Sequence, residues 1–188
     1  MFDALNQLSL ARDNETGSHI LRTQHYVRVI ALALRDLSMP HASQLNDETI
    51  EAMFLAAPLH DVGKVGIPDS ILLKPGKLTE SEWTVMKTHA LIGENVLLSA
   101  ADEAGSADLK IAGDLAGGHH EKWNGTGYPR ALAGEAIPLS ARIMAIADVY
   151  DALTSSRVYK SSWSHEEAKS EIASLSGTQF DPQVVKAF

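Results

Sequence analysis

Apolar residues recur at three- and four-residue steps over the first fifth of the chain, which is the spacing of an amphipathic helix. The clearest stripe consists of Ile20, Thr23, Val27, Ile30, Leu34 and Leu37. Pro40 follows this stripe and cannot continue a helix, so the first long helix is expected to end before it. The apolar side of this helix should pack against other helices.

Capping residues mark the starts of further helices. Thr79 with Glu82, and Ser164 with Glu167, form capping boxes, in which each pair satisfies two backbone N–H groups reciprocally. The expected helices run from residue 46 or 47 to about 57, from 79 through His89, and then over 106–118, 137–155, 164–175 and 181–188. Pro58 should kink the first of these, and Gly63 should end it.

The pattern predicts an all-α protein. We find no convincing two-residue alternation of apolar and polar positions, which a half-buried strand would show. The glycine-rich stretches 63–76 and 117–134 are expected to be loops between helices. The chain is expected to form one domain over 1–188, a helical bundle, with residues 1–10 as the remnant of a linker from an upstream regulatory domain.

Composition narrows the class of protein. The net charge is −8 in 188 residues, which argues against binding to a nucleic-acid duplex. The longest apolar run is far below the ~20 residues of a membrane span, and the N-terminus does not resemble a signal peptide. The sequence has no cysteine, which removes thiolate metal sites and fits a cytoplasmic location.

Histidines and carboxylates supply the candidate chemistry. The candidate metal ligands are Glu15, His19, His60, Asp61, His89, His119, His120 and Asp148. Asp148 lies inside an otherwise apolar helix, where an unpaired carboxylate is costly. In a helical bundle such inward groups converge around a metal centre in the core. Imidazole and carboxylate favour iron, manganese, nickel, cobalt or zinc.

The number of ions follows partly from the ligand types. Asp61 has two carboxylate oxygens and is the natural bridge between two ions. Adjacent helical residues point about 100° apart, so His119 and His120 should suit two ions, or one ion and the substrate, better than one ion. Two divalent ions with two anionic ligands leave a positive site, which would attract a phosphate to an acidic protein.

These residues stand in motifs that resemble those of the HD-GYP domain family. "HDVGKVGIPDSILLKPGKLTESEW", "MKTHALIGENVL" and "HHEKWNGTGYP" are similar to three blocks of that family, in order. "ARDNETGSH" upstream and "ARIMAIADVYDALTSSRVYK" downstream complete the resemblance, which covers residues 10–188. One departure is Val158, where proline is common in the family; it should alter local stiffness more than chemistry.

The resemblance implies a metal-dependent phosphodiesterase that hydrolyses cyclic di-GMP to pGpG, and on to GMP if cleavage continues. All eight family ligand positions are filled. Glu15 is typical of members with three metals, although two ions remain an alternative. Iron or manganese is expected first, with nickel, cobalt or zinc as alternatives.

The resemblance also implies roles for residues around the ligands. Asp61 and Lys64 are expected to be catalytic, with Lys64 contacting the scissile phosphate or protonating the leaving oxygen. Arg157 and Lys160 are expected to bind substrate. Tyr128 could line the substrate cleft, or its loop could contact diguanylate cyclase-type partners; a purely structural turn is the simpler interpretation, favoured by Gly125, Gly127 and Pro129.

Two other functions stay open on the sequence alone. The chain could hydrolyse a different cyclic dinucleotide or another nucleotide, which would require the same His-Asp core. It could also be a non-catalytic sensor that binds cyclic di-GMP and a partner protein. Such a sensor would be expected to have lost ligands, which this sequence has not.

Overall fold

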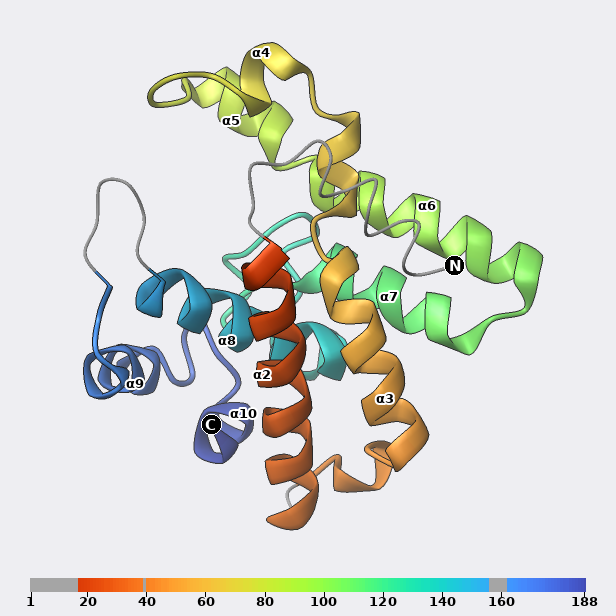
Figure 1. The fold of residues 1–188 in the computed structure, drawn as a ribbon, viewed down its shortest axis with the longest axis vertical. Coiled ribbons are helices and arrows are strands. Elements are labelled where there is room, and N and C mark those ends of the chain that lie inside the picture. Colours follow the sequence, from red (N-terminus) through yellow and green to blue (C-terminus); the bar gives the residue numbers. More distant parts are fainter. Residues whose placement is uncertain (1–16, 39, 156–161) are drawn as a thin grey trace.

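The computed structural model describes residues 17–38, 40–155 and 162–188, and over these ranges the chain forms helices and no β-strand (Figure 1). The α-helices are α2 (Gly17–Asp36), α3 (Asp47–Ala56), α4 (Asp69–Leu72), α5 (Glu80–Met86), α6 (His89–Ala104), α7 (Ala107–Gly118), α8 (Leu139–Thr154), α9 (His165–Ser174) and α10 (Pro182–Ala187). Four 3₁₀ helices connect them: η1 (Ala42–Gln44), η2 (Ala57–Leu59), η3 (Val62–Gly66) and η4 (Gly134–Ala136). The all-α helical bundle is confirmed. Glu15, Arg157 and Lys160 lie outside the described residues.

Several expected helix starts are confirmed with their capping contacts. Both capping boxes form, at the start of α5 and at the start of α9. The side chain of Asn46 accepts a hydrogen bond from the backbone N–H of Thr49. Asp181 caps α10 in the same way, and Pro182 occupies its first turn. Local sequence therefore determines these boundaries.

Two expected boundaries are wrong. The helix that begins after Thr79 ends at Met86, and His89 is the first residue of α6 rather than a residue within a helix. Gly63 does not end the helix before it; α3 stops at Ala56, and Gly63 lies inside η3. The stretch 63–76 is accordingly not a simple loop, because it contains the end of η3 and all of α4.

The core forms where α7 and α8 meet the other helices. Helix α7 packs against α3, α6 and α8, while α2 packs against α3 and α8. Their fully buried side chains include Leu34, Leu97, Leu115, Ile143 and Ile146. The pair α4 and α5 stands away from this body, at the top of Figure 1. The packing brings the start of α2, the end of η2, the start of α6, the end of α7 and the middle of α8 together around the candidate ligands.

Candidate metal centre

The candidate ligands that the structure describes form two adjacent groups. Asp61, His89, His119 and His120 make the first group, and His19, His60 and Asp148 make the second. Within each group, one possible ligand atom of every residue lies within 4.8 Å of the others. The imidazole ring of His60 lies 5.6 Å from that of His19 and 5.2 Å from that of His119, between ring centroids. The two groups therefore adjoin at His60.

Asp61 lies at the border of the two groups. Its Oδ1 is 3.2 Å from Nε2 of His89 and 3.7 Å from Nε2 of His119. Its other oxygen, Oδ2, is 3.2 Å from Nε2 of His60, which belongs to the second group. One carboxylate thus presents one oxygen to each group, which is the geometry of a ligand shared by two ions.

His119 and His120 do not diverge as expected for adjacent residues of a helix. Their ring centroids are 3.9 Å apart, and both residues fall in the first group. This arrangement differs from the expectation that the two imidazoles suit two ions, or one ion and the substrate, better than one ion.

Backbone carbonyls orient three of the histidines. Nδ1 of His60 lies 2.8 Å from the carbonyl oxygen of Ala57, Nδ1 of His89 lies 2.8 Å from that of Met86, and Nδ1 of His119 lies 2.9 Å from that of Ala116. A carbonyl can only accept a hydrogen bond, so each Nδ1 must carry the proton. The lone pair of each ring is then on Nε2, the atom that points toward Asp61.

A carboxylate from another helix orients His19. Nδ1 of His19 lies 2.7 Å from Oδ2 of Asp151, and both side chains are buried. Asp151 is held in turn by Arg22, whose Nε lies 2.5 Å from Oδ1 and whose Nη2 lies 3.0 Å from Oδ2. The hydroxyl of Ser155 donates a further hydrogen bond to Oδ2, at 3.2 Å. A carboxylate behind a metal-binding imidazole fixes its tautomer and its orientation.

Burial and neighbouring charges set the protonation of these groups. Burial alone would raise the pKa of Asp61, but His60, His89 and Lys64 outweigh it and hold that pKa well below its usual range. Burial lowers the pKa of His119 well below the ordinary value and that of His120 to about 3. Burial opposes ionisation of Asp151 as well, yet the contacts from His19 and Arg22 lower its pKa to about 2. The carboxylates are thus anionic and these imidazoles neutral, as metal ligands must be.

Gly63 allows the backbone that follows Asp61 to lie close to the backbone that carries His89. A Cβ atom at this position would lie 1.9 Å from the carbonyl oxygen of His89 and 2.5 Å from the backbone nitrogen of Gly93. Both contacts are with backbone, which cannot move aside as a flexible side chain can. The glycine therefore lets η3, which follows Asp61, lie directly on the first turn of α6, which begins with His89.

The loop after the histidine pair folds back over the first group. The Tyr128 ring stacks on the His120 ring at 4.6 Å between centroids, with 28° between their planes. The backbone N–H of Tyr128 donates to the carbonyl of His120, at 3.2 Å. Gly127 packs on the backbone of Glu121 and Lys122, where a Cβ would lie 2.3–2.6 Å from backbone atoms. The glycine is thus needed for close approach.

Two buried carboxylates hold this loop in place. Glu121 accepts hydrogen bonds from the backbone N–H groups of Arg130 and Leu132, at 2.8 and 3.0 Å. The Arg130 guanidinium also forms an ion pair with Glu94, a buried residue of α6. The contacts of Glu121 therefore indicate a structural role in the loop, because both of its carboxylate oxygens accept hydrogen bonds from backbone N–H groups.

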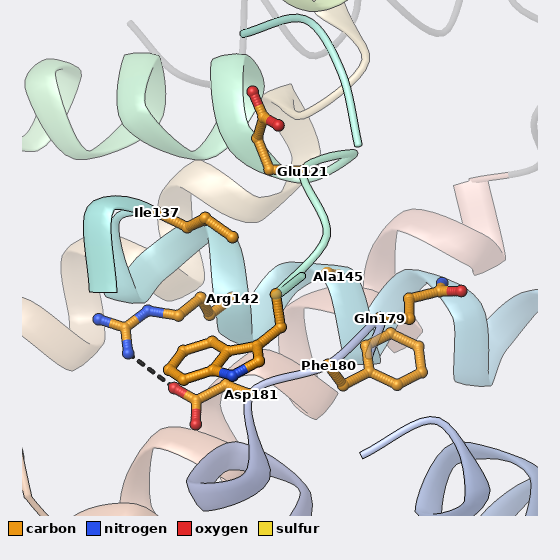
Figure 2. Close-up of a pocket in the computed structure, with 8 residues that line it drawn as sticks. Glu121, Ile137, Arg142, Ala145, Gln179, Phe180 and Asp181 are labelled. Atoms are coloured by element: carbon orange, nitrogen blue, oxygen red, sulfur yellow. Dashed lines mark hydrogen bonds and ion pairs between the residues drawn. The ribbon is translucent and has the colours of Figure 1, made fainter. Parts of the chain in front are cut away.

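The outer edge of the loop is tied to the C-terminal segment, around a small cavity shown in Figure 2. Trp123 donates its backbone N–H to the carbonyl of Gln179 at 3.0 Å. Beside the indole, Nη1 of Arg142 lies 2.6 Å from Oδ2 of Asp181, and both side chains are buried. The cavity has a volume of about 10 Å³, which is room for a single water. It is too small for a nucleotide, so this region supports the loop.

Lys64 lies at the edge of the first group. Its Nζ is 2.8 Å from Oδ2 of Asp61, three residues earlier in the chain. An ammonium group is thereby placed beside the carboxylate oxygen that faces His60. Tyr128 and Lys64 are both close to the ligands, whereas the positions of Arg157 and Lys160 are not described.

Three carboxylates other than the candidate ligands make clear contacts around the centre. These are Asp151, Glu121 and Glu94. A carboxylate three residues after Asp148 on the same helix was a detectable signal for Asp151. No comparable local pattern exists for Glu94, because its partner Arg130 comes from a distant loop.

The donor atoms fit divalent transition metals. Among the described residues, Oδ1 of Asp61 and the Nε2 atoms of His89 and His119 are buried and make no hydrogen bond of good geometry. Buried polar atoms normally have partners, and a metal ion would provide one for these three. Imidazole nitrogens with a few carboxylate oxygens suit iron, manganese, nickel, cobalt or zinc, whereas magnesium and calcium favour sites made of oxygen alone.

Comparison with known proteins agrees with this site. The HD domain model matches residues 14–184. A cyclic di-GMP phosphodiesterase of Vibrio cholerae is 56% identical over 186 residues, which are 98% of this chain and 38% of that protein. A cyclic di-GMP phosphodiesterase of Thermotoga maritima is 43% identical over 188 residues, covering 100% of this chain and 48% of that protein. A 3′3′-cGAMP-specific phosphodiesterase of V. cholerae is 42% identical over 176 residues, covering 94% and 31%.

Solved structures share the fold at lower sequence identity. A cyclic GMP-AMP specific phosphodiesterase of V. cholerae superposes with a TM-score of 0.62 at 21% identity, over 99% of this chain and 45% of that one. An HDGYP protein of Bdellovibrio bacteriovorus gives a TM-score of 0.61 at 18% identity, over 99% and 60%. These two comparisons support the helical-bundle fold.

The chain spans less than half the length of the curated relatives named above. Within the described ranges, no helix has both the length and the apolar character needed to cross a lipid bilayer. The family match extends over nearly the whole chain, and the ligand-bearing motifs fall within it. The chain therefore belongs to the HD domain family, and its motifs resemble those of the HD-GYP group within it.

Proposed function

We propose that this chain is a metal-dependent phosphodiesterase that hydrolyses cyclic di-GMP to linear pGpG, and to GMP if the second bond is also cleaved. The observation that carries the proposal is the pair of adjoining ligand groups with Asp61 between them. Relatives at 56% and 43% identity that are named cyclic di-GMP phosphodiesterases support it.

We propose two or three divalent ions, with iron or manganese first and nickel, cobalt or zinc as alternatives. The two groups would hold one ion each, and Asp61 would contact both ions. A third ion would involve Glu15, which lies outside the described residues but four positions before His19 in the sequence. This assignment rests on the resemblance of the sequence motif alone.

The chain's own side chains would arrange the phosphodiester for cleavage. Bound divalent ions would lower the pKa of a water molecule to roughly 7 and would place positive charge beside the phosphate. Asp61 and the imidazoles hold that charge in a fixed place, so no reorganisation is needed as charge grows on the phosphate oxygens. The oxygen of water would form a bond to phosphorus as the bond between phosphorus and the 3′ oxygen breaks, and the 3′ oxygen must then receive a proton.

Lys64 is the described residue best placed to act on the phosphate or on the leaving oxygen. Its ammonium group, 2.8 Å from Asp61, lies at the edge of the cluster rather than within it. From there Lys64 would donate a hydrogen bond to a phosphate oxygen, or a proton to the 3′ oxygen. Arg157 and Lys160 are proposed to bind substrate from the resemblance alone.

Tyr128 would line the entrance to the site. Its ring covers His120, and burial raises the pKa of its hydroxyl, so the hydroxyl remains protonated and able to donate. The same loop would present a surface to diguanylate cyclase-type proteins. We also propose an upstream regulatory domain in the full-length protein, and action in the cytoplasm, in keeping with a sequence that has no cysteine.

Hydrolysis of a hybrid cyclic dinucleotide is a second candidate function. A relative named a 3′3′-cGAMP-specific phosphodiesterase is 42% identical to this chain. Both substrates contain the same 3′–5′ phosphodiester and differ in one base. The ligand groups would act on the same phosphodiester in both substrates. Any preference for one dinucleotide must therefore come from residues that contact the bases.

Elemental analysis of protein purified without oxygen, together with hydrolysis of both dinucleotides by the same sample, tests the proposal. Two or three equivalents of metal per chain, with faster turnover of cyclic di-GMP, is the expected result. Asp61→Asn should lower hydrolysis by at least about 100-fold. Asp36→Asn, at an exposed position at the C-terminal end of α2, serves as its control.

Two results would contradict the proposed function. Metal-loaded protein that binds cyclic di-GMP without cleaving it would favour a sensor. Faster cleavage of 3′3′-cGAMP would favour the second candidate.

A further inference from the structure

We propose that Asp151 is a positioning residue that controls metal binding at the second ligand group, that of His19, His60 and Asp148. The inference rests on the proposed metal-dependent function, because it concerns how one of the two groups is kept able to bind. Asp151 is not one of the residues in either ligand group. The contact between Asp151 and His19 is the feature that distinguishes the second ligand group from the first.

His19 depends on Asp151 for its orientation. The Nδ1···Oδ2 distance is 2.7 Å, and His19 is 6% exposed while Asp151 is 2% exposed. An ionised carboxylate can only accept, so Nδ1 of His19 carries the proton and Nε2 carries the lone pair for a metal. Without this acceptor, the proton could move to Nε2, which would then be unable to bind an ion.

Asp151 is itself fixed by a closed network. Arg22 donates to both of its oxygens, at 2.5 and 3.0 Å, and also donates to the Ser155 hydroxyl, at 2.8 Å. Ser155 completes the ring by donating to Asp151. Each of these three side chains therefore contacts the other two, and the carboxylate has one defined orientation.

The network joins the same two helices that supply the ligands. His19 and Arg22 are three residues apart on α2, and Asp148 and Asp151 are three residues apart on α8. Residues at this spacing lie on one face of a helix. Helix α8 thus provides one ligand, Asp148, and also holds the ligand that α2 provides.

The first group does not share this dependence. His89 and His119 are oriented by backbone carbonyls that no side-chain substitution removes. Nor does His60 depend on Asp151, because its Nδ1 faces the carbonyl of Ala57. Loss of Asp151 should therefore weaken one metal site selectively, through His19 alone.

Asp151→Asn tests this inference with little change of shape. An asparagine presents one N–H₂ group, which meets a donor of either Arg22 or His19 in every orientation. We expect the affinity of one metal equivalent to fall about 10- to 100-fold, the usual cost of losing such a partner. The remaining metal should bind as in the wild-type protein. The measurement is a manganese(II) titration of metal-free protein against a competing chelator, with elemental analysis.

Matched variants separate positioning from a general loss of folding. Arg22→Ala should weaken the same equivalent, by less than Asp151→Asn does. Arg28→Ala is its control, because Arg28 lies on the same helix, is similarly exposed and pairs with Glu51 instead. Asp181→Asn is the control for loss of a buried aspartate–arginine pair. Neither control should change metal binding.

A double variant gives the sharpest test. If Asp151 acts through His19, then Asp151→Asn should have no further effect on metal binding in a His19→Ala background. An additional loss in that background would overturn the inference, and so would unchanged metal binding in the folded Asp151→Asn protein. Either result leaves the proposed function standing as long as the wild-type protein binds metal and hydrolyses the dinucleotide. Wild-type protein that takes up no metal would overturn both.

Discussion

Three of the histidines in the centre are oriented by the backbone, and His19 is oriented by a side chain from another helix. His60, His89 and His119 each follow the end of a helix, and the side chain of each faces the backbone carbonyl of the residue three positions earlier. Their Nδ1 atoms contact those carbonyls. His19 lies in the first turn of α2, where the backbone groups without helical partners are N–H donors. The Nδ1 atom of His19 contacts the carboxylate of Asp151 on α8 instead.

This difference shows that side-chain substitutions can leave some ligands of a metal centre correctly oriented while they disturb another ligand. Backbone anchoring requires only that the chain turn at the right place, and it survives most substitutions of neighbouring side chains. Side-chain anchoring requires that two helices pack correctly and that specific residues occupy both. Four predictions test this contrast, from the largest expected effect to the smallest.

Gly63→Ala should have the largest effect, because it disturbs the backbone frame itself. The added methyl would overlap the carbonyl of His89, and neither backbone segment can move aside alone. We expect the free energy of unfolding to fall by about 3 kcal/mol or more, with metal lost from both groups. Denaturant unfolding and metal analysis would measure this. Gly66→Ala is the control, since its methyl would meet only the Ile92 side chain, at 3.1 Å. Equal losses of stability in Gly63→Ala and Gly66→Ala would show that the close backbone contact at Gly63 has no special importance.

Removal of metal should have the next largest effect. Buried donor atoms of Asp61, His89 and His119 make no hydrogen bond of good geometry among the described residues, so bound metal should stabilise the fold. At a free metal concentration 100 times Kd, the expected stabilisation is about 2.7 kcal/mol for one site. Thermal unfolding with and without a chelator gives the measurement. A melting temperature that chelation leaves unchanged would show that these atoms do not bind metal.

Glu121→Gln should have an intermediate effect, because Glu121 anchors a loop rather than a ligand. Its two oxygens accept two backbone N–H groups, whereas glutamine has one acceptor oxygen and would turn an N–H₂ group toward the other N–H. We expect a loss of about 2 kcal/mol in unfolding free energy and a higher KM, with the metal content unchanged. Glu135→Gln, at an exposed position of η4, is the control. Loss of metal in Glu121→Gln would show that the loop also orients the histidines.

Thr79→Ala should have the smallest effect, because it removes a helix cap far from the ligands. Thr79 accepts the backbone N–H of Glu82 at the start of α5. Its loss should cost about 1 kcal/mol of stability, and neither metal content nor turnover should change. Thr84→Ala, on an exposed face of the same helix, should cost less. A fall in turnover in Thr79→Ala would indicate that the pair α4 and α5 takes part in the reaction.

Helix-capping residues made several helix starts predictable from the sequence. Capping residues at Thr79, Ser164 and Asp181 placed three helix starts correctly. Prediction failed between α5 and α6, where Lys87 and Thr88 break the helix without a glycine or proline to signal it. The break depends on how α6 packs against η3, which is a tertiary effect.

The candidate site was predictable only in part. The motifs identified which histidines and aspartates matter, and the structure brings the described ones together. Asp151 could not be assigned to His19 from the sequence, because the two residues are 132 positions apart and meet only through the packing of α2 on α8. The grouping of His119 with His120 likewise became clear only from the positions of their side chains.

The tie between the histidine loop and the C-terminal segment has a consequence for synthesis on the ribosome. The backbone N–H groups of Trp123 and Asn124 donate to the carbonyls of Gln179 and Thr178, which are translated after every ligand-bearing segment. A growing chain therefore carries all of these segments before the outer edge of the loop can close. Until Gln179 has been added, the loop that follows the histidine pair lacks both of these backbone contacts.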